Sequence, residues 1–123
     1  MDNAVNWFDI PVVDLDRATK FYSEILSSEL RIENFAGELM AIFPFKKGSG
    51  VGGALIAQES QKPSMDGAIV YLDAGDDVAV ALEKVETAGG EIIMPKTSIG
   101  PMGFIAYIKD TEGNRVGLHS AVV

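Results

Sequence analysis

Hydrophobic positions in the first half of the chain follow two periods. Between residues 15 and 26 they recur every three or four positions, which predicts a helix with one apolar face, and Asp14 or Asp16 can accept the free amide hydrogens at its N-terminus. Three short apolar runs, at residues 5–12, 39–45 and 51–57, and the alternation of polar and apolar side chains at 29–32 are typical of strands. The pattern therefore predicts a strand, a helix and then three strands.

The same order of elements returns in the second half. A polar connector, residues 58–66, separates the halves, and a second apolar stripe over 78–88 begins at Asp76-Asp77 and stops at Gly89-Gly90, as a capped helix does. Strands are predicted at 68–73, 91–94, 103–108 and 114–120. The second half therefore repeats the first.

These patterns predict an α+β protein of two βαβββ units, residues 1–57 and 67–123, in one domain of residues 1–123. Each unit has one helix, which can cover only one face of its sheet. The other faces must be covered by each other or by a partner chain, which gives a curved mixed sheet around a cavity. We expect the function to reside in that cavity.

Composition and charge narrow the range of partners. The chain is 47% hydrophobic with a formal net charge of −8, which favours a globular protein and argues against nucleic acid or an anionic membrane as partner. It has no cysteine, so disulfides, thiolate nucleophiles and Cys-based zinc sites are excluded. The first residues show no signal-peptide pattern and no apolar run approaches the roughly 20 residues of a membrane span, so we expect a cytoplasmic protein.

One dinucleotide-like motif has the wrong context. Residues 48–53 have the GxGxxG spacing, and Asp73 follows at the distance of a ribose-binding acid. The glycines follow Lys46-Lys47 instead of a buried strand, and no long amphipathic helix comes after them. We therefore interpret them as hairpin glycines.

Three segments carry a resemblance to a known family: Ile10 to Ala18 with Phe21-Tyr22, then Ala88-Gly89-Gly90, and Asp110 to Val116. With these segments the chain resembles the vicinal oxygen chelate superfamily of glyoxalase I, bleomycin-resistance proteins and extradiol dioxygenases over nearly its whole length. Its second half is most similar to small, glyoxalase-related proteins that are poor in metal ligands. The resemblance implies the glyoxalase-like fold, a ligand cavity and a homodimer.

In metal-using members, the resemblance implies ligands from the first and last strands of each unit, usually His and Glu. The matched positions here are Trp7, Ala54, Val70 and Gly117. Indole, alkyl groups and hydrogen offer no lone pair to a divalent ion, and shifting a strand by one residue does not restore a His/Glu set. We therefore expect no metal ion and no other cofactor, and neither glyoxalase-type nor dioxygenase chemistry.

Two residues are candidates for acid–base catalysis. His119, the only histidine, follows Gly117 by two positions, and Asp9 follows Trp7 by two, so both can face the cavity. A structural histidine and a rim or helix-cap aspartate are the alternatives. A relocated metal site built from Asp9, Glu38 or His119 is a further alternative, although one histidine and scattered acids seldom converge.

Six residues are candidates for ligand binding. Trp7 would fill the space at a former metal position and stack on an aromatic ligand, while Arg115 would pair with an anionic group. The full set is Trp7, Phe43, Phe45, Met102, Phe104 and Arg115. For the aromatic residues and Met102 the alternative role is core packing, and for Arg115 it is a solvated position beside a turn.

The sequence therefore predicts a small-molecule-binding protein whose cavity takes an apolar or aromatic metabolite or drug without the usual metal. The alternative is a metal-independent lyase or isomerase that uses His119 and Asp9.

Overall fold

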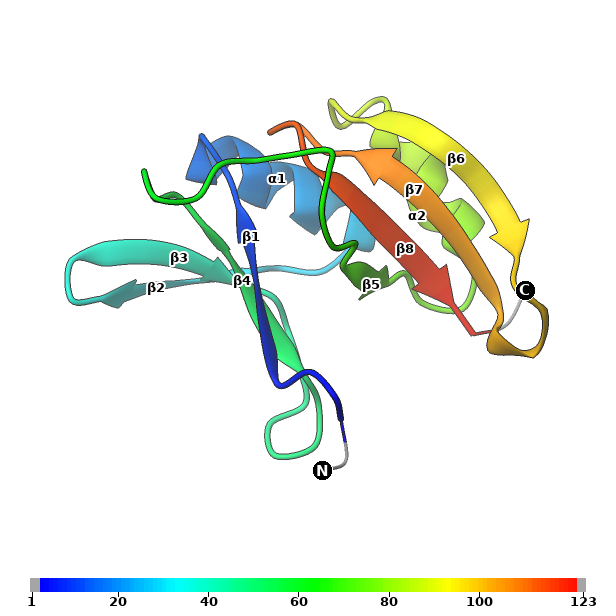
Figure 1. Ribbon diagram of the computed structural model, residues 1–123, viewed down its shortest axis with the longest axis horizontal. Coiled ribbons are helices and arrows are strands. Elements are labelled where there is room, and N and C mark those ends of the chain that lie inside the picture. The colour runs from blue at the N-terminus through cyan, green and yellow to red at the C-terminus, as the bar shows by residue number, and fades with distance from the viewer. Residues whose placement is uncertain (1–2, 122–123) are drawn as a thin grey trace.

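The computed structural model describes residues 3–121 and shows the predicted element order (Figure 1). The first unit contains β1 (Trp7–Pro11), α1 (Leu15–Leu26), β2 (Arg31–Phe35), β3 (Glu38–Ile42) and β4 (Gly52–Ile56). The second contains β5 (Tyr71–Asp73), α2 (Val78–Val85), β6 (Glu91–Ser98), the 3₁₀ turn η1 (Gly100–Met102), β7 (Phe104–Lys109) and β8 (Arg115–Ser120). We expected no signal peptide from the first residues of the sequence, and two of these, Met1 and Asp2, lie outside the described residues.

Both units have the same sheet topology. The strand orders are β1-β4-β3-β2 and β5-β8-β7-β6, and in each sheet the first strand is parallel to the last while the other pairs are antiparallel. The prediction of two βαβββ units in an α+β fold is therefore confirmed. The eight strands form two four-stranded mixed sheets, which lie side by side at an angle to each other in Figure 1.

The helices begin where the sequence predicts. The Asp14 carboxylate accepts a hydrogen bond from the Arg17 amide (3.0 Å), and the Asp77 carboxylate accepts one from the Ala79 amide (2.9 Å), so each aspartate caps its helix. The C-terminal boundary of α2 is less accurate: the helix ends at Val85, not at residue 88.

One hydrophobic core joins the two units. Helix α1 packs against α2, and buried side chains from both helices and both sheets form a single cluster. Tyr22 lies at its centre with no exposed surface, in edge-on contact with Phe21 (5.0 Å between ring centres) and Phe43 (5.5 Å). Each sheet therefore has a helix-side face that belongs to the shared core and an open face that no helix covers.

A turn of the second unit holds the start of α1. The Glu112 carboxylate accepts hydrogen bonds from the backbone amides of Val13 (2.8 Å) and Asp14 (2.7 Å). It also forms an ion pair with Arg17 (2.7 Å). Its side chain is fully buried. Burial alone raises the pKa of Glu112, but the hydrogen bonds from Arg17, the two amides and Thr111 outweigh it and lower the pKa to about 2.

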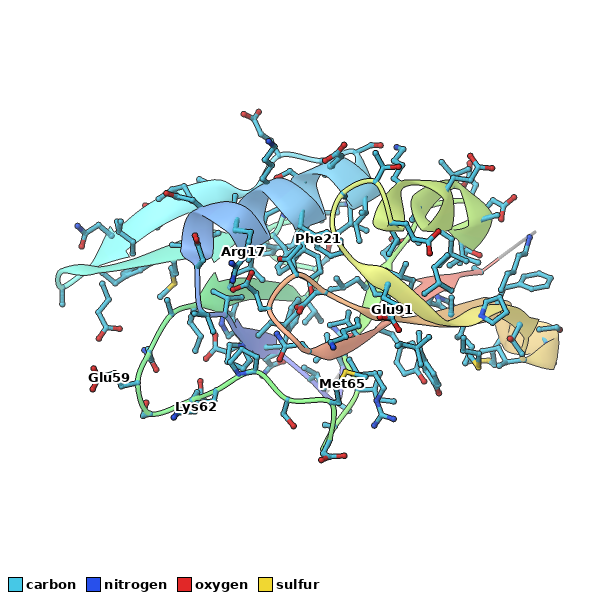
Figure 2. All side chains as sticks on the ribbon, turned by 90° about the horizontal axis from the view of Figure 1, so that it is seen from above. Arg17, Phe21, Glu59, Lys62, Met65 and Glu91 are labelled. Carbon is cyan, nitrogen blue, oxygen red and sulfur yellow. The ribbon has the colours of Figure 1, made fainter. Side chains whose placement is uncertain are left out.

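The same turn reaches further into the core. The Tyr22 hydroxyl donates to a carboxylate oxygen of Asp110 (2.6 Å), and the Asn114 side chain donates to the Pro11 carbonyl (2.7 Å). We call residues 110–114 the clasp, because their polar side chains connect β1 and α1 to the second unit. Figure 2 shows Arg17 and Phe21 on α1, and Glu59 and Lys62 on the connecting loop at the periphery.

The second unit departs from the predicted strands at two places. Strand β5 covers only three residues, whereas β6 extends to Ser98 through two register irregularities on either side of Met94.

No helix within residues 3–121 is long and apolar enough to span a membrane. The cytoplasmic location stays a prediction.

Candidate functional site

The open faces of the two sheets carry most of the predicted site residues. Side chains alternate along a strand, so the residues that flank the core positions face the opposite side. The first open face contains Trp7 and Asp9 of β1 beside Gly52 and Ala54 of β4. The second open face contains Tyr71, Asp73, Tyr107, Lys109, Arg115, Gly117 and His119.

Trp7 lies on the first open face above a glycine. A Cβ atom on Gly52 would come within 2.9 Å of the indole and 2.7 Å of the Phe45 ring, so both rings rest directly on the backbone of β4. Phe45 meets the indole edge-on (6.1 Å between ring centres), and the indole Nε1 donates to Asp9 (3.1 Å). Trp7 nevertheless keeps 43% of its surface exposed, which leaves the ring accessible.

Tyr71 occupies the corresponding place on the second open face. Its ring covers Gly117, where a Cβ atom would collide with it. Tyr107 flanks Gly117 from the other side, and the two hydroxyl groups form a hydrogen bond of 3.0 Å. This hydrogen bond, followed by burial, raises the pKa of Tyr71, so its hydroxyl stays protonated at neutral pH.

This arrangement corrects one matched position. Val70 precedes β5 and packs against the core, so it does not face Gly117. Tyr71 is the residue that stands opposite Gly117, as Trp7 stands opposite Gly52 on the parallel neighbouring strand. Each unit therefore presents an aromatic ring over a glycine.

The open faces do not fit the metal centre that the family resemblance implies. Trp7, Tyr71, Ala54 and Gly117 offer no imidazole or carboxylate at the matched positions. Among the described residues, no three His, Cys, Asp or Glu side chains lie close enough together to hold a metal ion. The residues present therefore give no basis for a step through a divalent ion.

The two acid–base candidates belong to different sheets. Asp9 accepts the hydrogen bond from Trp7, while the His119 ring bonds to the Met102 carbonyl oxygen (2.7 Å) and stands opposite Asp73 in the β5–β8 register. No hydrogen bond joins Asp9 to His119 within residues 3–121. The chain does not bring them together, and a catalytic role for either stays a prediction.

The remaining candidates are spread over three places. Phe43 is buried on the helix side of the first sheet beside Phe8 and Tyr22. Phe104 packs against the core of the second unit, and Met102 is 69% exposed in η1. Only Trp7, Phe45, Asp9, Arg115 and His119 lie on the open faces or at their edge.

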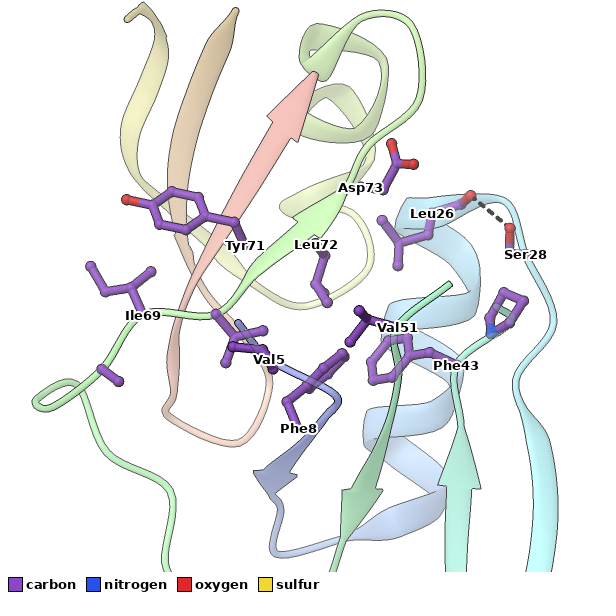
Figure 3. Close-up of a pocket in the computed structure, with 13 residues that line it drawn as sticks. Val5, Phe8, Leu26, Ser28, Phe43, Val51, Ile69, Tyr71, Leu72 and Asp73 are labelled. Carbon is purple, nitrogen blue, oxygen red and sulfur yellow. Dashed lines mark hydrogen bonds between the residues drawn. The ribbon is translucent and has the colours of Figure 1, made fainter. Parts of the chain in front are cut away.

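A hollow lies on the helix side of β1, next to Phe8 (Figure 3). It has a volume of about 650 Å³ and lies between Phe8, Phe43 and Val51 of the first unit and residues 68–73 of the second. Its lining is mainly apolar, and Leu72 points into it whereas the Tyr71 ring is directed away. Trp7 does not line this hollow, and its role in ligand binding stays a prediction.

The missed feature is the tyrosine pair. Three residues form it, because Tyr71 and Tyr107 are both register partners of Gly117, which lies between them. The sequence contains the required signal only in part, because a glycine in a strand indicates close approach of another group but does not identify that group.

Comparisons with known proteins agree with this architecture. The sequence-family model of the Glyoxalase/Bleomycin resistance protein/Dioxygenase superfamily matches residues 4–118. In solved structures, a glyoxalase/bleomycin resistance protein from Streptomyces sp. CB03234 superimposes with a TM-score of 0.70 at 24% identity, covering 95% of this chain and 100% of that one. TnmS3, titled an antibiotic binding protein from the same organism, gives 0.67 at 23% identity, covering 96% and 95%.

The fold thus defines the class: a protein of two βαβββ units, each with an aromatic ring over a strand glycine. The chain belongs to the Glyoxalase/Bleomycin resistance protein/Dioxygenase superfamily. The Mycobacterium tuberculosis protein named "Putative glyoxylase CFP32" is 30% identical over 129 residues, which cover 94% of this chain and 45% of that protein. The chain therefore spans about half the length of the curated relatives it matches.

Proposed function

We propose that the protein binds a small, planar, apolar or aromatic organic molecule between the open faces of two copies of the chain, without a divalent metal ion. The observation that carries this proposal is the pair of half-exposed rings, Trp7 and Tyr71, each seated on a glycine of the neighbouring strand. Two alternatives have less support: no three His, Cys, Asp or Glu side chains of the described residues gather to hold a metal ion, and Asp9 and His119 lie on different sheets with other hydrogen-bond partners.

The rings are held in place before any ligand arrives. Asp9 and Phe45 fix Trp7, and Tyr107 fixes Tyr71. A ligand that stacks on a ring already fixed by its neighbours loses less conformational entropy on binding than one that must order a mobile side chain. This favours recognition of flat, apolar surfaces.

A second copy of the chain is the proposed cover for the open faces. The helices of both units pack against each other, so the two open faces of one chain do not close over one another. A twofold pair can place the first open face of one copy against the second open face of the other, which gives two equal cavities.

A relative adds support of a weaker kind. TnmS3, whose structure is similar, is titled an antibiotic binding protein. At 23% identity this likeness shows the fold alone, so the ligand class is carried to this chain by analogy.

Calorimetric titration with a panel of bicyclic aromatic compounds tests the proposal. We expect a ligand to bind equally well with and without EDTA, and Trp7→Ala to weaken binding at least about ten-fold, because truncating a stacking ring removes a major contact. The control is Ala68→Phe, which narrows the hollow of Figure 3 from an exposed position.

Two results would contradict this function. Binding that disappears with EDTA would require a metal ion that the open faces do not hold. Binding that survives Trp7→Ala and is lost in Ala68→Phe would move the ligand to the hollow on the helix side of β1.

A further inference from the structure

The second open face contains hydrogen-bond donors that the fold itself does not use. Tyr71 and Tyr107 reach across Gly117 to each other, and the guanidinium carbon of Arg115 lies 6.0 Å from the centre of the Tyr107 ring. Gly117 permits this meeting, since a side chain there would occupy the place of the Tyr71 ring. We call these three side chains the Tyr–Arg cluster.

Arg115 has an unusual surrounding for a cation. Its Nε is buried and has no hydrogen-bond partner among the described residues. Asp9 and Asp66 line the same small hollow, but neither forms an ion pair with Arg115 within residues 3–121. A buried donor without an acceptor costs free energy, so this position favours an acceptor brought by a ligand.

The other cations of this face have acidic neighbours. Lys109 stands opposite Glu91 in the β6–β7 register, and His119 stands opposite Asp73. Arg115 differs from both, because its register partner is Lys109. Asp9 and Asp66 are thus the acids that share a hollow with Arg115, and neither forms an ion pair with it within residues 3–121.

The tyrosines add directional donors. One hydroxyl donates to the other, which leaves one O–H of the pair free to donate outward. Tyr71 is 44% exposed, so this group is open to a ligand. Together with the guanidinium N–H groups, it forms a set suited to the two oxygens of a carboxylate.

We infer that the Tyr–Arg cluster binds the carboxylate of an aromatic acid whose ring stacks in the cavity between the two copies. The inference rests on the proposed function and adds the chemical class of the ligand. A single carboxylate held by one local cation is compatible with a chain of net charge −8, whereas a polyanion would be repelled.

Two probes that differ only in charge test the inference: naphthalene-2-carboxylate and naphthalene-2-carboxamide. Dissociation constants are measured for the full chain by ligand-observed NMR. We expect the carboxylate to bind about ten-fold more tightly, because its hydrogen bonds to Arg115 are charge-assisted.

Two variants and one matched control locate the contact. Arg115→Gln should remove the preference for the carboxylate, and Tyr107→Phe should reduce it. Lys109→Gln removes a positive charge from the neighbouring register position and should leave the preference within about two-fold, since it lies outside the cluster.

Each outcome decides the matter. Equal binding of both probes to the unmodified protein overturns the inference and leaves the proposed function intact, and it needs no variant to fold. A preference that Arg115→Gln retains, or that Lys109→Gln abolishes, also overturns it. If neither probe binds, the inference fails together with the proposed aromatic site.

Discussion

At the residue scale, Glu112 of the second unit makes several polar contacts with the start of α1 in the first. It forms an ion pair with Arg17 and accepts hydrogen bonds from two free backbone amides at the N-terminus of the helix. A carboxylate near a helix N-terminus is also stabilised by the helix dipole. The buried charge of Glu112 therefore contributes to the junction of the two units, beside the shared core and the Tyr22–Asp110 contact.

Glu112→Gln keeps the shape of the side chain and removes its charge. We expect the free energy of unfolding at about pH 7 to fall by about 1–3 kcal/mol, because charge-assisted hydrogen bonds become neutral ones in a buried place. Urea unfolding measures the change. The control is Glu24→Gln on the exposed side of α1, which should change stability by less than about 0.5 kcal/mol.

The same variant has a defined pH dependence. The pKa of Glu112 is about 2 in the folded protein against an ordinary value of 4.5, so its contribution is complete above about 4.5 and is lost as the pH falls toward 2. The unmodified protein should therefore lose more stability than Glu112→Gln between about pH 5 and pH 3. Parallel pH profiles for the two proteins would contradict this assignment.

At the element scale, α1 is the helix that connects the units. Its apolar face packs on the first sheet and on α2, while its polar contacts run to the clasp. The Tyr22 hydroxyl is the deepest of these contacts, and burial, followed by the charge of Asp110, raises the pKa of Tyr22 well above its usual value. The phenol therefore remains a donor to the Asp110 carboxylate.

Tyr22→Phe removes that donor without changing the packing of the ring. We expect a loss of about 1–3 kcal/mol in the free energy of unfolding, because a buried carboxylate oxygen loses a partner. The matched control is Tyr107→Phe, whose hydroxyl lies near the surface, with an expected loss below about 1 kcal/mol. Equal losses in the two variants, measured by thermal or urea unfolding, would show that the Asp110 contact contributes little.

How far the sequence predicts these elements depends on how local their causes are. The helices begin correctly at Asp14 and Asp77, because capping involves residues two or three positions apart. Strand β5 is short and follows an apolar run without alternation, so the pattern does not distinguish Val70 from Tyr71 on the open face.

Contacts between the units lie beyond any local pattern. The sequence shows the residues of the clasp as a turn, but not that Glu112 reaches Val13 across 99 positions. The identity of the side chains on the first and last strands of each unit can be predicted from the sequence, since it requires only the strand positions. The tyrosine pair cannot, because it depends on two strands meeting on either side of Gly117.

At the scale of the whole molecule, two exposed sheet faces remain after the core is complete. Each has aromatic or long apolar side chains at its surface, including Trp7 and Phe45 on the first and Tyr71 on the second. Contiguous exposed apolar surface of this kind marks a place of association. The proposed dimer accounts for both faces at once.

Sedimentation velocity checks the dimer directly. We expect the unmodified chain to sediment as a dimer, and Phe45→Glu to shift it toward monomer, since a buried carboxylate without a partner opposes association. Val80→Glu replaces an exposed apolar residue on α2, away from the open faces, and should leave the dimer intact. A monomeric unmodified chain would contradict the proposal.

The two glycines beneath Trp7 and Tyr71 have a consequence for how such a protein diversifies. Because each ring rests on the main chain of a glycine, it can be exchanged for another side chain without repacking the interior. Selection for a new guest molecule can then act on a few surface positions while the scaffold beneath them stays constant.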